Sequence, residues 1–213
     1  MVQKEISKSV LRRLPGYLDY LKAMPEDASP NVSATYLANA LGMGEVQVRK
    51  DLAMVSDGGR PKVGYNRQLL IADIEQFLGY DNTNDAVLVG AGRLGRALLG
   101  YSGFAEYGLN IICGFDTDDA IVGVTKSGKQ VRPMEELETV CRERKILMGI
   151  ITVPAEQAQE VCDAMIRFGI RAIWNFAPIH LDVPAGVLVQ NENMATSLAV
   201  LSKHLSAQMK TSI

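Results

Sequence analysis

The stretch Asp85-Ala-Val-Leu-Val-Gly-Ala-Gly-Arg-Leu-Gly-Arg-Ala-Leu98 decides the fold. A short apolar run leads into the pattern G-x-G-x-x-G at Gly90, Gly92 and Gly95, and a helix-forming run follows. Glycines at this spacing allow a tight turn, a close approach of the backbone to a pyrophosphate and close packing of the helix, whose first N–H groups attract the anion. The stretch therefore predicts the first strand, turn and helix of a Rossmann domain that binds a dinucleotide.

An acidic residue farther along the chain indicates which dinucleotide is bound. A second apolar run at 109–115 predicts a strand that ends at Asp116, 21 residues after Gly95. A carboxylate in this position accepts hydrogen bonds from the adenosine ribose and repels a 2′-phosphate. We therefore expect NAD(H) and not NADP(H).

The rest of this part of the chain continues the alternation of strands and helices. Helical patterns cover 134–144 and 155–168, and apolar strands cover 146–153 and 172–176. The alternation predicts an α/β fold with a parallel sheet, in which ligands lie beyond the carboxyl ends of the strands. Simple strand termination at the prolines that follow two of these strands is an equally good interpretation. The expected cofactor contacts are Gly90, Ala91, Gly92, Arg93, Leu94, Gly95, Asp116, Thr152, Val153, Pro154, Asn175 and Phe176.

A turn-rich segment at 79–85 separates the Rossmann domain from a helical amino-terminal domain, which we place at 1–80. Within it, a helix that ends near Leu41 and a second helix over 45–55 flank a short glycine-containing turn. This layout is typical of a helix-turn-helix, whose second helix enters the major groove of DNA. The second helix buries Val48, Leu52 and Val55 on one stripe and carries Gln47, Arg49 and Lys50 on its polar side.

A glycine-rich segment follows the second helix. It runs over 57–67, contains Arg60 and Lys62, and lies where a winged helix has its β-hairpin wing. Such a wing contacts phosphates or a minor groove. The alternative is a solvated surface loop.

Composition limits the classes of protein that remain. The chain has 213 residues and a net charge of −2, and it contains no apolar run of the roughly 18 residues that a membrane span needs. The amino terminus lacks a secretory signal pattern, so we expect a cytoplasmic protein. Three cysteines without a C-x-x-C pair indicate buried thiols, and no metal-ligand cluster is evident. The residues after Tyr80 suffice for a Rossmann domain and one further helix, which disfavours an enzyme with a separate substrate domain.

The end of the chain, 193–213, predicts a helix with one apolar stripe. The stripe comprises Met194, Leu198, Leu201, Leu205 and Met209. It either closes the chain's own sheet or crosses into a second subunit to form a domain-swapped dimer.

Over nearly its full length the sequence resembles the Rex family of redox-sensing repressors. The resemblance rests on 14–18, Gln47-Val-Arg-Lys-Asp-Leu52, Val63-Gly-Tyr65, the glycine motif, Tyr101 with Gly103-Phe104, and Asn175-Phe-Ala-Pro178. It implies a homodimer with swapped terminal helices that binds a palindromic operator, is released by NADH, and controls genes of fermentation and NADH reoxidation. DNA contacts are then expected from Gln47, Arg49, Lys50, Arg60, Lys62 and Tyr65, and a nicotinamide pocket near Tyr101 and Phe104.

Three features depart from the common family pattern: Arg93 in place of Asn, the loop 56–59 in place of a segment richer in aromatic residues, and Asn193 in place of an acidic residue. We expect Arg93 to add positive charge near the pyrophosphate and Asn193 to remove a charge that couples the cofactor to domain position. A small NAD-dependent oxidoreductase with an accessory helical domain is the main alternative function. A dinucleotide-binding interaction module without DNA affinity is a third.

Overall fold

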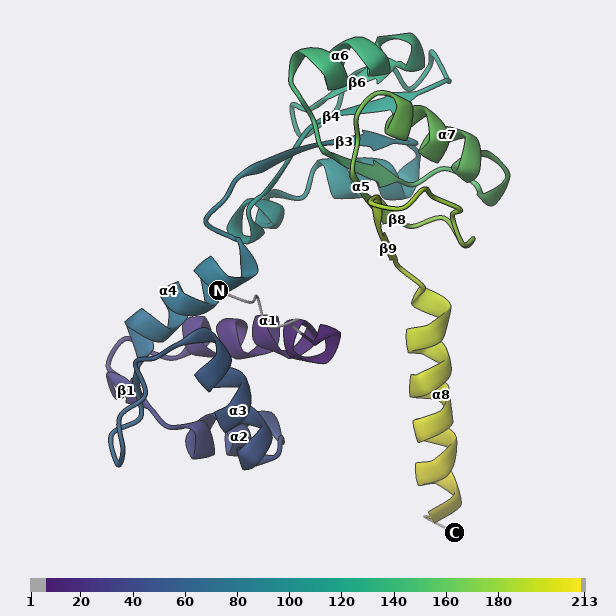
Figure 1. The fold of residues 1–213 in the computed structure, drawn as a ribbon. Helices are drawn as coiled ribbons and strands as arrows, with labels where there is room; N and C mark the ends of the chain where they lie inside the picture. Colours follow the sequence, from purple (N-terminus) through teal and green to yellow (C-terminus); the bar gives the residue numbers. More distant parts are fainter. Residues whose placement is uncertain (1–6, 212–213) are drawn as a thin grey trace. The chain divides into compact units, whose positions relative to one another are not determined.

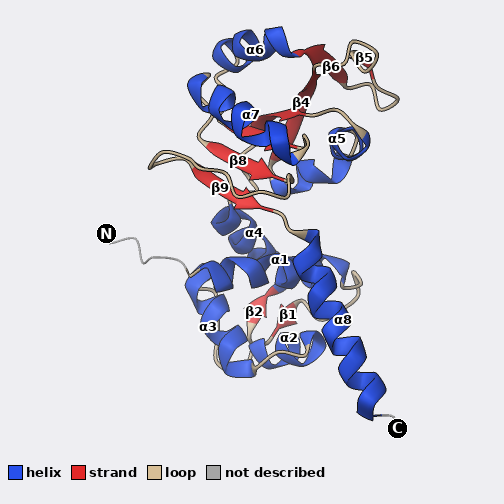
Figure 2. Cartoon of the chain, turned by 90° about the vertical axis from the view of Figure 1, so that its right-hand side faces the viewer, coloured by secondary structure: helices blue, strands red, loops and turns tan. Residues whose placement is uncertain are grey.

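The computed structural model describes residues 7–211, without the side chains of Met194, Ser197, Ala207, Lys210 and Thr211. The chain folds as two compact units that divide between Asn82 and Thr83, close to the boundary expected from the sequence (Figure 1). The first unit is mainly helical, and the second is built on a large sheet (Figure 2).

Within residues 7–82, the first unit contains four helices and a two-stranded ribbon. In order these are α1 (Lys8–Ala23), β1 (Asn31–Val32), α2 (Ala34–Leu41), α3 (Glu45–Val55), β2 (Tyr65–Asn66) and α4 (Arg67–Leu78). The Ser33 hydroxyl accepts a hydrogen bond from the Tyr36 N–H at the start of α2, and Gly42 ends that helix in the left-handed conformation. Helices α2 and α3 thus form the expected helix-turn-helix.

The core of the first unit is built from one face of each helix. Leu14, Tyr17 and Leu18 of α1 pack with Leu37, Leu52 and Ile74 from the other three helices. Helix α1 continues through Pro15 from Lys8 to Ala23, although a proline in a helix interior removes one hydrogen bond. Burial of the apolar stripe on both sides of Pro15 offsets the loss of this hydrogen bond.

The expected wing is a short hairpin. Arg60 and Gly64 form one antiparallel bridge, with both N–H···O distances at 2.9 Å, around a three-residue turn in which Lys62 has a φ of 65°. Beyond the bridge the chain pairs elsewhere, because Tyr65–Asn66 lies antiparallel to Asn31–Val32. The wing is therefore shorter than the segment 57–67 that the sequence indicated.

The second unit is a seven-stranded sheet in the order β5-β6-β4-β3-β7-β8-β9. Every neighbouring pair is parallel except β5–β6. Without the edge strand β5, the order is that of a dinucleotide-binding Rossmann sheet. The strands are β3 (Asn84–Val89), β4 (Leu109–Asp116), β5 (Gly123–Val124), β6 (Gln130–Pro133), β7 (Met148–Ile151), β8 (Ala172–Asn175) and β9 (Leu188–Asn191).

Helices cover both faces of this sheet. Helices α6 (Leu137–Glu143) and α7 (Ala155–Arg167) pack on one face, and α5 (Arg93–Leu99) packs on the other. Short 3-10 turns occur at Ser102–Tyr107 and Met134–Glu136, and the chain ends in α8 (Met194–Thr211). Sequence patterns missed β5, β6 and β9, because strands of two to four residues carry too little periodicity to be seen.

The three cysteines are buried free thiols, as expected. Cys113, Cys141 and Cys162 lie in the core between the sheet and helices α6 and α7. Burial raises the pKa of Cys141 and of Cys162 to about 11. None of the described helices is long and apolar enough to cross a membrane. Within the same residues, no group of three or more His, Cys, Asp or Glu side chains is arranged to hold a metal ion.

Candidate dinucleotide site and nucleic-acid interface

Two glycines of the G-x-G-x-x-G loop are required by the protein's own packing. Gly90 follows β3 with a φ of 99°, and a Cβ there would lie 2.8 Å from the backbone nitrogen of Val153. A Cβ on Gly95 would collide with the carbonyl oxygen of Gly90. The loop between β3 and α5 therefore closes tightly against the end of β7.

Gly92 has no such internal reason to be glycine. A Cβ on Gly92 would meet no atom within 4 Å, and its φ of −64° suits any residue. It precedes the first turn of α5, where backbone N–H groups lack acceptors within the helix. Arg93 and Leu94, the first residues of that turn, are exposed. This open cradle fits a pyrophosphate group, which needs a close backbone approach and gains from the cation of Arg93.

Asp116 ties the end of β4 to the glycine-rich loop. One carboxylate oxygen accepts from the Ala91 N–H at 2.7 Å, and the other accepts from the Asp118 N–H at 3.0 Å. Asp116 remains half-exposed, and each of its oxygens keeps a second lone pair. The carboxylate therefore both orients the loop and remains able to accept from a ribose hydroxyl.

The residues that follow β7 support the same loop. The Thr152 hydroxyl lies 2.7 Å from the Gly90 carbonyl oxygen and donates to it. Val153 is almost buried beside Gly90, while the exposed Pro154 precedes α7. Thr152 thus holds the glycine turn in place, and Pro154 borders the site on the side of β7.

Asn175 ends β8, the neighbour of β7, and its side chain is fully buried and hydrogen-bonded within the protein. Its amide donates to the carbonyl oxygens of Ala177 and Ile179 and to the side-chain oxygen of Asn191, and its own oxygen accepts from the Ala177 N–H. Asn175 therefore braces the loop beyond β8 and has no polar group directed at a ligand. Phe176 beside it is half-buried.

Tyr101 and Phe104, near which a nicotinamide pocket was expected, lie at the other edge of the sheet from the glycine-rich loop. Both line a cavity of about 270 Å³ with Leu109 and Asn110, which begin β4, whereas Asp116 ends it. Eight strand residues span about 25 Å. The reason is topological: the segment after the first Rossmann helix returns to the amino ends of the strands.

An aromatic row extends from Tyr101 across the sheet. Neighbouring rings in the order Tyr101, Phe104, Trp174 and Phe176 have centroids 4.9, 5.6 and 4.8 Å apart. Trp174 also donates from its indole to Glu192 at 2.9 Å. The row therefore connects the segment after α5 with β8 and with the residue two positions before α8.

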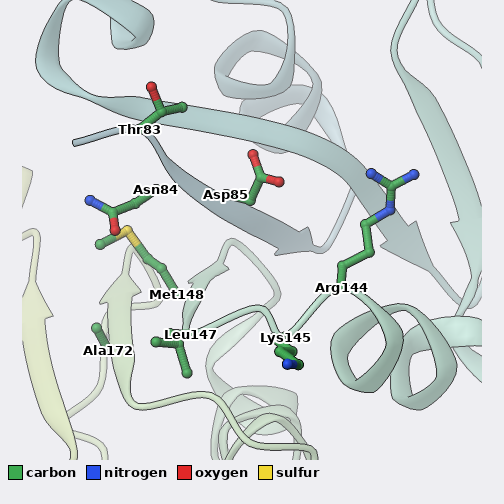
Figure 3. Close-up of a pocket in the computed structure, with 8 residues that line it drawn as sticks. All are labelled: Thr83, Asn84, Asp85, Arg144, Lys145, Leu147, Met148 and Ala172. Atoms are coloured by element: carbon green, nitrogen blue, oxygen red, sulfur yellow. The ribbon is translucent and has the colours of Figure 1, made fainter. Parts of the chain in front are cut away.

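A further cavity lies at the edge of the sheet where β3, β7 and β8 begin (Figure 3). It measures about 390 Å³, and Asp85, Arg144 and Lys145 are among the side chains that line it. The six residues of β3, about 20 Å, separate it from the glycine-rich loop. It is therefore not part of the dinucleotide site.

In the first unit, a buried ionic network fixes α3 against α1. Both carboxylate oxygens of Asp51 accept from the Arg13 guanidinium, at 2.7 and 2.8 Å, and one also accepts from the Tyr17 hydroxyl at 2.8 Å. Asp51 is 3% exposed. Burial and the hydrogen bond to Asp51 raise the pKa of Tyr17 to about 12. The sequence analysis missed this network, although Asp51 lies at the border between the polar face and the buried stripe of α3.

Two of the expected base readers are engaged within the protein. With its amide oxygen directed at Arg13, Gln47 accepts from that guanidinium at 2.9 and 3.1 Å. Arg49 forms an ion pair with Glu45 one turn earlier on α3. Lys50 is exposed.

The wing residues divide into exposed cations and a buried aromatic ring. Arg60 and Lys62 are exposed, as a phosphate contact requires. Tyr65 is only 9% exposed, and a Cβ on Gly59 would lie 2.8 Å from its ring. Tyr65 thus packs under the wing, and burial raises its pKa. Its side chain supports the loop and does not reach outward to DNA.

Comparison with known proteins identifies the family. Residues 81–179 match the family described as "CoA binding domain", and residues 5–53 match "Putative DNA-binding protein N-terminus". The chain is 43% identical to the redox-sensing transcriptional repressor Rex of Treponema denticola, over 93% of this chain and 95% of that protein. The chain belongs to the Rex family. Identity to the Rex repressor of Porphyromonas gingivalis is 39%, over 97% of this chain and 95% of the relative.

Solved structures of a Rex-family repressor have the same fold. RSP in complex with beta-NAD+ and operator DNA is 32% identical, with a TM-score of 0.89 over 99% of this chain and 97% of that one. RSP in complex with beta-NADH is also 32% identical, with a TM-score of 0.88 over 99% of both chains. The predicted fold class, an amino-terminal DNA-binding domain followed by a Rossmann domain, is confirmed. The relatives of this chain are transcriptional repressors, so the oxidoreductase alternative is set aside.

Two departures from the Rex pattern have local explanations. Asn193 caps α8, since its side-chain oxygen accepts from the Thr196 N–H at 3.2 Å. In the loop 56–59, the Ser56 hydroxyl accepts from the Gly58 N–H, and Gly59 gives room to the ring of Tyr65. The loop therefore keeps its shape without aromatic residues of its own.

Proposed function

We propose that this protein is a redox-sensing repressor that binds a palindromic operator as a homodimer and leaves it when NADH binds. The observation that carries the proposal is the open cradle at Gly92, on a chain of the Rex family. The same chain presents a helix-turn-helix and an exposed cationic wing. As an operator-binding protein it would work in the cytoplasm, on genes of fermentation and NADH reoxidation.

On the DNA side, α3 enters the major groove and the wing contacts the backbone. Lys50 is exposed, whereas Gln47 and Arg49 reach a base edge after giving up Arg13 and Glu45. Arg60 and Lys62 hold the wing to phosphates, which position a protein on the duplex without reading its sequence.

On the cofactor side, the backbone at Gly92 and the cation of Arg93 hold the pyrophosphate, and Asp116 accepts from the adenosine ribose. Because a 2′-phosphate would face the Asp116 carboxylate, NAD(H) is the ligand and not NADP(H). When bound, the dinucleotide supplies a nicotinamide ring that is neutral when reduced and positively charged when oxidised. Thr152, Val153 and Pro154 border the site, and Asn175 and Phe176 shape it from β8.

The homodimer rests on α8. Leu198, Leu201, Leu205 and Met209 are 63, 65, 56 and 64% exposed along one helix. A continuous apolar stripe of this kind marks an interaction surface. We assign it to a second copy of the chain, with the two α8 helices exchanged between subunits, which also gives the twofold symmetry that a palindrome requires.

Release from DNA requires a large change in relative affinity. Emptying an operator that is nearly full needs a difference of about 5.5 kcal/mol between the two states, more than one lost side-chain contact provides. We therefore attribute release to a rotation of the subunits that changes the spacing of the two α3 helices. The aromatic row from Tyr101 to Trp174, bonded to Glu192 before α8, is the element that this rotation would rearrange.

The test begins by selecting duplexes from a random pool and measuring binding of the best one with saturating NADH or NAD⁺. We expect NADH to release the duplex and NAD⁺ to leave it bound. Lys50→Ala should bind the duplex more weakly and still bind NADH, and Gly92→Ala should keep the duplex and need a higher NADH concentration for its release. Equal binding of the selected duplex with both forms of the cofactor would contradict the proposal.

A further inference from the structure

The outermost stripe of α3 combines apolar and cationic groups. Val46, Lys50 and Ala53 repeat at spacings of four and three residues, which places them on one line along the helix. The buried stripe has the same spacing but starts two residues later, about 200° farther around the helix. Val46 is 62% exposed, and Lys50 and Ala53 are exposed as well. This stripe therefore points directly away from the core.

The polar residues beside this stripe are held by other side chains. Gln47 accepts from Arg13, and Arg49 is paired with Glu45. Lys50, by contrast, forms no salt bridge with any residue in 7–211. On this side of α3, Val46, Lys50 and Ala53 can thus enter a groove without the loss of a hydrogen bond or ion pair within the protein.

A single exposed valine is common on protein surfaces and carries no meaning by itself. Val46, however, is in the first turn of the helix that enters the major groove, and the N-terminal residues of such a helix contact base edges. The apolar group that the major groove offers is the C5-methyl of thymine. The single methyl of Ala53 lets the same stripe approach closely.

We propose that Val46 contacts the C5-methyl of a thymine in each operator half-site, next to the base or phosphate that Lys50 binds. The inference rests on the proposed function, because it requires sequence-specific binding through α3. It differs from the expectation that polar side chains alone provide the reading. It assigns part of the specificity to an apolar contact.

The test replaces each thymine of the selected operator by deoxyuridine, one position at a time and in both half-sites. For the unchanged protein, one position should weaken binding roughly fourfold per half-site, as expected for the loss of one buried methyl group. Val46→Ala should bind the unmodified operator roughly three- to tenfold more weakly per half-site, and the same deoxyuridine should cost it little more.

The matched control is Val124→Ala, the same change at a valine that is 71% exposed on β5. It should respond to deoxyuridine as the unchanged protein does. A fraction of misfolded variant lowers binding to every duplex alike, so the ratio between the two duplexes still reports the contact. The inference is overturned if Val46→Ala and the unchanged protein lose the same factor at every thymine. Selection of no preferred sequence would contradict the proposed function and the inference together.

Discussion

The two units hold their recognition groups in different ways. In the first unit, side chains from separate helices fix α3: Arg13 of α1 bonds both Asp51 and Gln47 of α3. In the second, the ligand loop depends on backbone groups and on missing side chains, at Gly90, Gly92 and Gly95. The partners Arg13 and Asp51 are 38 residues apart in the sequence, whereas the three glycines lie within six residues.

This difference explains why the two sites are not equally visible in the sequence. A backbone site has a fixed local shape, so its glycines recur at a fixed spacing. A side-chain network needs only compatible residues that meet after folding. The difference also predicts distinct responses to mutation, of which the largest concerns the buried charge.

Asp51→Asn should destabilise the first unit by about 3 kcal/mol or more, because it leaves the Arg13 guanidinium without its carboxylate. Circular dichroism during denaturation measures the loss, while the fluorescence of Trp174, the single tryptophan, reports the second unit separately. Asp19→Asn, at an exposed carboxylate on α1, is the control and should change little. Equal stability of the two variants would show that the network does not stabilise the first unit.

Gly95→Ala and Gly92→Ala should separate folding from binding in the second unit. At Gly95 the added methyl collides with the Gly90 carbonyl, so a loss of about 1–3 kcal/mol in stability is expected. At Gly92 the added methyl meets open space, so the stability of the second unit should not change. NADH affinity should fall roughly tenfold or more, and each factor of ten corresponds to about 1.4 kcal/mol of binding free energy. Titration with NADH measures the affinity, and Trp174 fluorescence during unfolding measures the stability of the second unit. Unchanged NADH affinity in Gly92→Ala would exclude the cradle as the pyrophosphate site.

High pH should weaken the two units in turn. The pKa values of Cys141 and Cys162 are raised from about 9 to about 11, and that of Tyr17 from about 10 to about 12. The folded state then keeps protons that the unfolded chain releases, so stability is complete below the ordinary pKa and falls as pH rises through this window. Melting followed by Trp174 should therefore decline from about pH 9, before that of the first unit. A Cys141→Ala, Cys162→Ala double variant should reduce this early slope, and Cys113, whose pKa burial also raises, accounts for the part that remains.

Asp116→Asn removes the negative charge but keeps an oxygen that can accept from the Ala91 N–H. It should reduce NADH affinity by about 1.5 kcal/mol, and it should also bring the affinities for NADH and NADPH closer together. Asp118→Asn is the matched control, since its exposed side chain accepts from the Ala120 N–H. Parallel titrations with NADH and NADPH give the result. An unchanged ratio of the two affinities would argue against a ribose contact.

Asn193→Asp is expected to have the smallest effect on stability, because the two residues are equally good helix caps and a carboxylate adds about 0.3–1 kcal/mol at a helix start. Any larger change should appear in the coupling between NADH and DNA. The measurement is the NADH concentration that releases half of the selected duplex. If this concentration does not move, the missing charge at Asn193 has no part in the coupling.

The sequence by itself determined the alternation of strands and helices around the glycine loop and Asp116, the helix-turn-helix and the buried thiols. These features follow from local spacing, from periodicity and from the rule that parallel strands bring their carboxyl ends to one edge. The same local rules correctly ended α2 at Gly42.

Only the tertiary structure decided where the candidate contact residues lie. Tyr101 and Phe104 lie near the start of β4, Asn175 is bonded within the core, and Tyr65 packs under the wing. It also revealed that Arg13 holds α3 and that Val46 lies on its outermost stripe. Side-chain direction and long-range pairing depend on contacts between distant segments, which no local pattern of residues encodes.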